Sequence, residues 1–336
     1  MRTGAAIICL FLTAAPFALR SQSQGDYILI ARRSPVAEIA DATTLQTITR
    51  IHFDFLAERI SGIPGTPVVK VDGYQEGGPC CKHYSLNLAT QQLTEDRPLN
   101  SPAYALVSPD GRWRYELRSF RGPVLEAFNL REHGPSRQLF RPGLPPEDQS
   151  GNWYASGTWS LDRFYLYVRR PDHPGFLWTV VPGVESLGAG IPVSAFNEVP
   201  NCFRPMPTMR SILSSGDNLI LYEPFGNRLR TSRHCEGIPG GAWFVDPATG
   251  RLTKQIAPEF HFASLIPDGL QPVLYATALA GKNSIGEPEQ LLRLNAQDGA
   301  VMKSRAMGPG ESLVISASRL TGVPSGDITV KVTATP

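Results

Sequence analysis

Cysteine and histidine are the residue types of this sequence best suited to chemistry, and they gather in two segments. The first segment holds Cys80, Cys81 and His83, and the second holds His234 and Cys235. Thiolate and imidazole groups together suit copper or zinc. Neither segment has the C-x-x-C or H-E-x-x-H spacing that marks a zinc site, so both loops would have to meet to bind a metal. We therefore predict no metal site, and a metal-dependent enzyme is the alternative.

Disulfide bonding is the expected role of the four cysteines that follow the N-terminal leader, because exported proteins are oxidised. Four cysteines allow three pairings. Cys202 and Cys235 flank the inner strands of one repeat and are expected to bridge within it. Cys80 and Cys81 are adjacent in the sequence, so a disulfide bond between them would be strained. A tight turn, such as the preceding Gly-Gly-Pro would form, is the setting in which such a bond is possible. Two disulfides, or one disulfide with a vicinal pair, are predicted.

Aromatic side chains are the other candidates for binding. Trp153 and Tyr154 follow a Gly-Asn pair and are candidates, with His83 and His234, for a binding surface. The aromatic residues that alternate along strands are assigned to packing between repeats. No G-x-S-x-G motif is present in the sequence, which disfavours a hydrolase of the α/β type.

Four recurring turn motifs mark the β-strands that would position these residues. Each signal contains an aspartate, precedes a β-rich run and lies about fifty residues from the next: Asp110, Asp162, Asp217 and Asp268. Because each aspartate occupies the same turn of its own repeat, turn formation explains the four carboxylates better than catalysis does. A period near fifty that is built from short strands is typical of a β-propeller.

A second turn recurs between two further strands of each unit. It opens with an Asp or Asn side chain that can accept hydrogen bonds from the backbone two residues ahead: Asp41, Asn87, Asn129, Asp246 and Asn295. Gly250 and Gly299 stand where a positive φ is needed. The two signals together predict four antiparallel strands per unit.

The expected architecture is therefore an all-β propeller of six four-stranded blades, or seven if a diverged unit is hidden. Five units are expected at 51–97, 101–142, 151–195, 205–258 and 259–308. The remaining pieces, 25–50 and 310–336, would pair into one composite blade and close the ring, which hides exposed strand edges. The chain has 336 residues, of which 42% are hydrophobic and 18% charged, with 31 Gly and 30 Pro, and this balance suits many short strands.

The N-terminus resembles an export signal. Arg2 precedes a mostly apolar run from Ala5 to Leu19, which is short for a membrane span. We expect residues 1–23 to be a signal peptide and residues 24–336 to form a single propeller domain in the periplasm or outside the cell. No membrane span is expected after cleavage. The near-neutral charge, with scattered basic residues, argues against nucleic-acid binding.

The S-P-D-G turns followed by aromatic-rich strands resemble the WD40-like repeats of TolB-type propellers. The FVDPATGRL turn resembles the repeats of YVTN and quinoprotein amine dehydrogenase β-chain-like propellers. This resemblance implies the fold, and the chain lacks the Trp-Asp strand ending of true WD40 repeats.

A non-catalytic module that binds a ligand or protein at the mouth of the central channel, without a cofactor, is the functional expectation. The alternatives are a metal-dependent lactonase-like or quinoprotein-like enzyme and an accessory subunit of a dehydrogenase.

Overall fold

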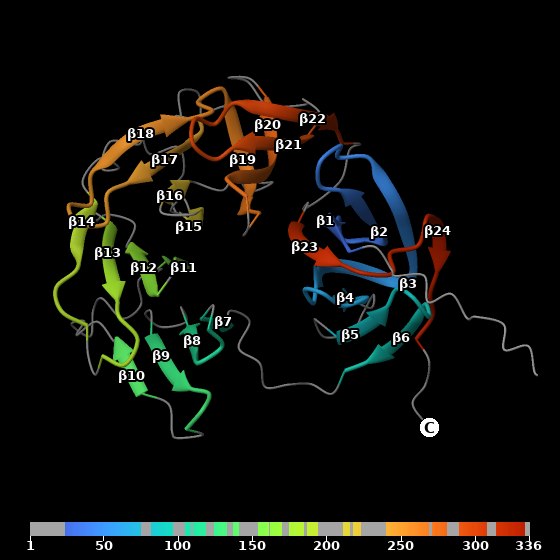
Figure 1. Ribbon diagram of the computed structural model, residues 1–336, viewed down its shortest axis with the longest axis horizontal. Coiled ribbons are helices and arrows are strands. Elements are labelled where there is room, and N and C mark those ends of the chain that lie inside the picture. Colours follow the sequence, from blue (N-terminus) through green and yellow to red (C-terminus); the bar gives the residue numbers. More distant parts are fainter. Residues whose placement is uncertain are drawn as a thin grey trace, which may run out of the picture.

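The computed structural model describes part of the chain, and the statements below refer to that part. The described residues are 24–74, 82–96, 105–108, 110–118, 124–132, 137–140, 154–160, 162–169, 175–184, 187–193, 211–215, 218–222, 240–268, 271–280, 289–307 and 314–332. All regular elements in these ranges are β-strands. They form four sheets of four strands and one sheet of eight, set around a centre in chain order (Figure 1). The all-β propeller prediction is confirmed.

Blade one is built from both ends of the described chain. β23 (Val314–Leu320) pairs antiparallel with β1 (Gly25–Ala31) along its whole length. β2 (Ser34–Asp41) and the first part of β3 (Thr47–Gly62) complete the blade. The predicted closure by the N- and C-terminal segments is therefore confirmed.

Blade two shares its first strand with blade one. β3 pairs with β2 over residues 47–57 and with β4 (Val68–Tyr74) over residues 56–62, and the register shifts between Ala57 and Arg59. β5 (Lys82–Asn87) and β6 (Gln92–Glu95) follow. The boundary expected between residues 50 and 51 is wrong, because one strand crosses it. A β-bulge, which bends a strand and increases its twist, lets β3 leave one blade and enter the next.

The four remaining blades are regular antiparallel sheets whose strands follow one another in sequence. Blade three contains β7 (Ala105–Val107), β8 (Trp113–Arg118), β9 (Val124–Asn129) and β10 (Arg137–Phe140). Blade four contains β11 (Tyr154–Ser160), β12 (Arg163–Arg169), β13 (Gly175–Val180) and β14 (Ile191–Val193). Blade five contains β15 (Ser211–Ser215), β16 (Asn218–Tyr222), β17 (Ala242–Val245) and β18 (Leu252–Ile256). Blade six contains β19 (Phe260–Pro267), β20 (Val273–Ala280), β21 (Glu289–Asn295) and β22 (Val301–Ala306).

The turn chemistry expected from the sequence is present. Asp246 Oδ1 accepts a hydrogen bond from Ala248 N at 2.9 Å, and Asp41, Asn87, Asn129 and Asn295 act in the same way. Gly250 and Gly299 have φ of 68° and 77°.

The S-x-D turns behave alike where they are described. Asp110 accepts from Arg112 N and from the Ser108 hydroxyl, and Asp268 accepts from Gln271 N. Asp162 lies exposed beside Arg163, and Asp217 lies outside the described residues. The described turn contacts support structural roles for Asp110 and Asp268.

The core consists of apolar clusters between neighbouring blades. Two clusters join blade three to blade four and blade four to blade five. Two more join blade five to blade six and blade six to blade one. A fifth joins blade one to blade two. Aromatic residues contribute as expected: the rings of Tyr115 and Trp159, from blades three and four, stack with centroids 4.9 Å apart.

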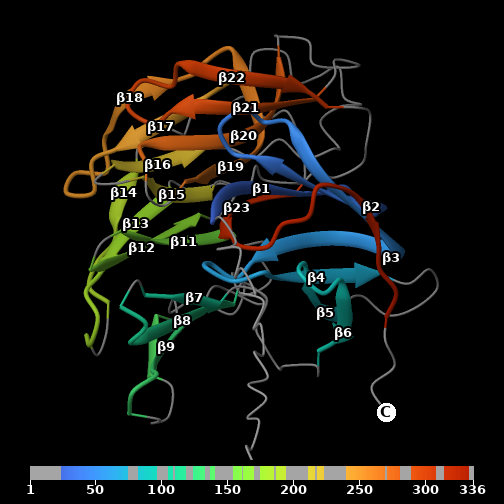
Figure 2. The ribbon, with the colours of Figure 1, turned by 45° about the vertical axis from the view of Figure 1, so that its right-hand side comes forward.

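A C-terminal strap, residues 321–332, strengthens the contact between blades one and two. Its strand β24 (Gly326–Thr329) pairs in parallel with β3, and in both ribbon views this red segment runs beside β3 (Figures 1 and 2). Val330 N donates to His52 O at 2.9 Å, and Val332 forms a bridge with Leu93 of β6. Ile328 and Val330 are buried in the cluster between blades one and two.

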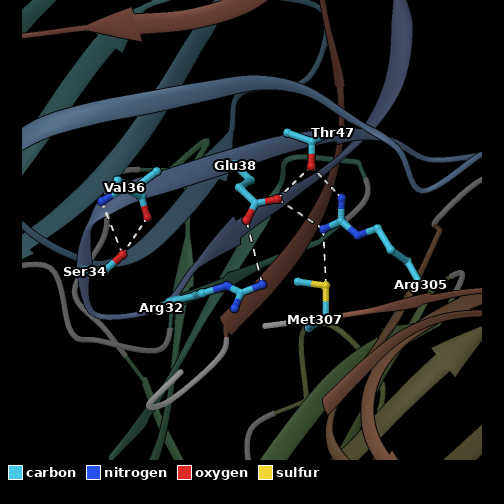
Figure 3. A network of polar contacts seen from close by, with 7 residues as sticks. All are labelled: Arg32, Ser34, Val36, Glu38, Thr47, Arg305 and Met307. Carbon is cyan, nitrogen blue, oxygen red and sulfur yellow. Dashed lines mark hydrogen bonds and ion pairs between the residues drawn. The ribbon is translucent and has the colours of Figure 1, made fainter. Parts of the chain in front are cut away.

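Ion pairs fasten blade six to blade one across the ring closure. Arg305 of β22 donates from Nη1 to Thr47 Oγ1 at 2.6 Å and from Nη2 to Glu38 Oε2 at 3.2 Å. Arg32 Nη2 lies 3.7 Å from the other oxygen of Glu38, so this carboxylate stands between two guanidinium groups (Figure 3). Burial lowers the pKa of Arg305, and the neighbouring Glu38 carboxylate opposes that effect.

His261 of β19 gives the fold a dependence on pH. Burial lowers the pKa of its imidazole below the ordinary value of about 6.5. The unfolded chain therefore binds the proton more readily, and stability is lost as the pH falls below about 6.5. We expect the free energy of unfolding to fall between about pH 7 and pH 5, and a His261→Gln variant to show a flatter profile. Urea titrations at each pH measure this, and the exposed His52, changed to Gln, is the control that should keep the wild-type slope.

Candidate binding site at a polar seam

The face of blade two that points away from blade one, together with the face of blade three beside it, is called here the polar seam. The strands of blade two alternate, so residues such as Val71, Tyr84 and Leu86 face the apolar cluster shared with blade one. The residues between them face the opposite side; most of them are polar, and Val68 and Tyr74 of β4 lie among them. The cross-strand register sets these polar residues in two rows, Arg59–Asp72–His83 and Ser61–Lys70–Ser85–Thr94.

The first row is centred on the carboxylate of Asp72. His83 Nδ1 lies 2.8 Å from Asp72 Oδ1, and Arg59 Nε lies 4.0 Å from Asp72 Oδ2. A neutral imidazole that donates from Nδ1 has Nε2 as its acceptor nitrogen. A carboxylate that holds an imidazole in one tautomer is common where histidine binds a ligand. The row therefore offers an oriented imidazole and a guanidinium side by side.

The second row is a compact hydrogen-bonded group. Lys70 Nζ donates to Ser85 Oγ at 2.5 Å and to Asp96 Oδ2 at 2.9 Å, and the Ser85 hydroxyl donates to Asp96 Oδ1 at 2.7 Å. Partial burial acts to raise the pKa of Asp96, but hydrogen bonds from Ser85 and Lys70 outweigh it and lower that pKa. Lys70 and Asp96 bond to each other as well as to Ser85, and we interpret this group as one that recognises a ligand.

The blade-three side of the seam mixes polar residues with apolar ones, among them Val124 and Phe128 of β9. Tyr115, Leu125 and Ala127 pack toward blade four. The residues between them include Glu116 of β8 and Glu126 of β9, which lie directly opposite each other in the register. The alternation of the strands places these two on the side of blade two.

On this side of blade three, Arg114 contacts two residues of its own blade. Arg114 Nη2 lies 3.0 Å from Glu116 Oε1, and its guanidinium carbon lies 4.5 Å from the centroid of the Phe128 ring. Glu116 is only 3% exposed. This wall thus carries a buried carboxylate paired with a partly exposed guanidinium that stacks on an aromatic ring.

The polar seam remains open to solvent from the side of blade two. The side chains of Arg59, Lys70 and His83 are 49%, 44% and 48% exposed. Within the described ranges, no apolar cluster contains residues of both blade two and blade three. Both ribbon views show β4–β6 and β7–β9 as neighbours around the ring (Figures 1 and 2). The described face of blade two therefore presents charged groups to solvent.

Only one of the binding residues predicted from the sequence has a described side chain. His83 lies on the polar seam. Tyr154 begins β11, where it pairs with Arg169, and its side chain is outside the described part. The other predicted residues all lie outside the described residues: Cys80, Cys81, Trp153, Cys202, His234 and Cys235. The disulfide pairings stay predictions.

Sequence reasoning missed the partners of His83. Arg59, Lys70, Asp72, Ser85 and Asp96 come from four different places in the chain. Polar residues alternating with apolar ones across 68–74 and 82–87 were the available signal. Among the described side chains, no group of three or more His, Cys, Asp or Glu is placed to hold a metal ion.

Comparisons with known proteins find only distant likenesses to solved structures. No family model and no curated protein matches this chain. A similar solved structure is AztD from Citrobacter koseri, 11% identical with a TM-score of 0.46, covering 86% of this chain and 83% of AztD. A TolB candidate from Agrobacterium tumefaciens is 13% identical with a TM-score of 0.43, covering 88% of this chain and 99% of the other. Dihydro-heme d1 dehydrogenase NirN, in complex with DHE, is 12% identical with a TM-score of 0.37, covering 86% of this chain and 56% of NirN.

The sheet topology defines the class of this protein as an all-β propeller. No helix long and apolar enough to span a membrane occurs in the part of the chain that the structure describes.

Proposed function

We propose that this protein is an exported β-propeller that binds a polar ligand or a protein partner and does not transform it. The single observation that supports the proposal is the exposed polar face of blade two, with His83, Asp72 and Arg59 in one row. Its charged groups are held by fixed partners, an arrangement that preorganises a surface for recognition.

The row and its neighbours indicate what such a ligand would be like. Arg59 and Lys70 are balanced by Asp72 and Asp96, so this face has little net charge near neutral pH. Donors and acceptors alternate across the strands at short spacing. Such a face suits a ligand that carries both donors and acceptors rather than a strongly charged anion or cation.

The experiment is a non-reducing native mass spectrum of the exported protein from its own host, which gives the mass of any ligand or partner retained. Affinity for that molecule is then measured by calorimetry for wild type and for His83→Gln and Asp72→Asn. We expect each substitution to weaken binding at least about tenfold, or about 1.4 kcal/mol. Thermal stability should change little, because exposed ion pairs contribute little to it.

A matched control is available on blade one. His52 Nε2 lies 3.5 Å from Asp327 Oδ2, so this pair is also an exposed histidine beside an aspartate. His52→Gln should bind as wild type does. Equal loss in both histidine variants, or no loss in His83→Gln, would remove blade two as the site. A stoichiometric metal, with activity that a chelator abolishes, would instead support the metal-dependent enzyme.

A further inference from the structure

We propose that the groove which holds the C-terminal strap also takes the strap of a second copy of this chain, so that two propellers exchange these segments. The groove, called here the strap groove, consists of the edge of β3 at residues 49–52 and the apolar cluster beside it. Blades one and two each have four strands without β24, so the strap is an addition to the ring. The proposal is independent of the ligand proposed for the face of blade two.

The edge of β3 is the part of the strap groove that binds main chain. β2 pairs with β3 along residues 47–57, and the opposite edge is divided between β4, over residues 56–62, and β24, over residues 49–52. Val330 N extends this pairing with its hydrogen bond to His52 O at 2.9 Å. The N–H and C=O groups of a strand edge pair with another strand whichever chain supplies it. An extended segment that adds a strand in this way is a recurring mode of recognition.

The apolar cluster is the part of the strap groove that selects side chains. Ile328 and Val330 are packed in the cluster between blades one and two and are 6% and 2% exposed. Asp327 and Thr329, which alternate with them, are exposed. Main-chain pairing gives affinity in this mode of binding, and pockets for alternate side chains give specificity. A second copy of the chain carries apolar residues at this same spacing.

Charge and length add to the match between groove and strap. Asp327 Oδ2 lies 3.5 Å from His52 Nε2, and Asp327 Oδ1 lies 4.0 Å from Arg50 Nη1. Farther along the strap, Val332 forms a bridge with Leu93 of β6. The groove therefore fits an extended segment in which an acidic residue precedes alternating β-branched residues. The strap of a second copy meets each of these conditions.

A short hinge connects the strap to the propeller. Residues 321–325 lead from β23 to β24 and include Pro324, and Gly322 has a φ of 63°. Proline fixes its own φ, which limits the courses that the hinge can take. The Thr49 hydroxyl donates to Pro324 O and holds the hinge beside β3. Short hinges favour exchange of an identical element between two copies, because the exchanged element keeps all of its contacts.

Shortening the hinge tests the proposal in the full exported chain. Deleting residues 322–324 leaves two connecting residues in place of five, and each residue spans at most about 3.6 Å. The strap then no longer reaches its own groove by the present course, but it can enter the groove of a second copy. After refolding from urea, light scattering should show a dimer whose fraction rises with protein concentration.

The matched control carries the same deletion together with Ile328→Asp. A carboxylate at this buried position opposes docking of the strap, because burial of an unpaired charge is unfavourable, so the control should be monomeric. Mixing the hinge-shortened chain with a chain that has the full hinge and Ile328→Asp should give a mixed dimer by native mass spectrometry. Monomers of the hinge-shortened chain at every concentration, or a dimer that Ile328→Asp leaves unchanged, would overturn the proposal.

A synthetic peptide of residues 321–332 gives a second measurement that does not depend on the deletion. It is added to the full-length Ile328→Asp chain at about 1 mM, the order of the effective concentration of a segment on a short flexible linker. The peptide should raise the urea midpoint of this chain toward that of wild type, because a ligand of the folded state stabilises it. A peptide that carries Ile328→Asp should leave the midpoint unchanged. Equal midpoints with both peptides would show that the groove does not take a strap from outside its own chain, and would overturn the proposal.

Discussion

Ending the chain after Leu320, and so removing the C-terminal strap, should lower the free energy of unfolding by about 4 kcal/mol or more. The strap places Ile328 and Val330, which are 6% and 2% exposed, in the cluster between blades one and two. Full burial of such a side chain contributes about 1.5–3 kcal/mol, and the backbone bonds of β24 to β3 are lost as well. Urea unfolding followed by circular dichroism measures the change.

A point substitution separates packing from the loss of chain. Ile328→Ala should cost about 2–4 kcal/mol, because it leaves a cavity between the two blades. Asp327 is the adjacent residue and is exposed, so Asp327→Asn should stay within about 0.5 kcal/mol of wild type. If the truncated chain unfolds at the wild-type urea concentration, the strap contributes nothing to the closure of the ring.

Glu38 at the ring closure should give the second large effect. Replacing it with Gln removes the negative charge between Arg32 and Arg305 and takes the Glu38 counter-charge from two guanidinium groups that are 18% and 21% exposed. Losing the partner of a partly buried charge costs about 1–3 kcal/mol, and we expect about 2 kcal/mol here. The midpoint of urea unfolding reports the change.

A double-mutant cycle tests whether this effect belongs to the contact between the blades. The cycle combines Glu38→Gln with Arg305→Met, and the coupling energy should be about 1–2 kcal/mol. Strictly additive changes would mean that Glu38 and Arg305 stabilise the fold independently and do not join blade six to blade one. Arg33 and Glu58, which form a more exposed pair on blades one and two, provide a comparison with little expected coupling.

Local signals made much of the fold predictable. The carboxylate of Asp246 closes its turn through contacts two and three residues away. The sequence shows such contacts directly, because all the atoms involved lie within a few residues. The boundary between units predicted at residue 50 was wrong because no local signal shows where β3 passes from one blade to the next. The alternation of β3 continues unbroken through residue 50 and shifts only at the bulge between Ala57 and Arg59, where the strand changes pairing partners.

The candidate site was predictable only in part. His83 stood out because of its residue type, but Asp72 lies eleven residues away and Asp96 thirteen, in segments that gave no separate signal. Their proximity depends on the register between β4, β5 and β6. Register is a property of strand pairing, and a shift of one residue would turn every side chain to the other face.

The sequence by itself determined the repeating blade, its turns and the joining of the two ends, because short-range hydrogen bonding and apolar alternation encode them. The tertiary structure alone decided which polar side chains gather on blade two and where the strap lies. Both depend on side chains distant in sequence, such as Lys70 with Asp96 and Ile328 with the core of blades one and two. The local sequence shows whether a blade face is apolar or polar, but only the tertiary structure shows which neighbouring element packs against that face.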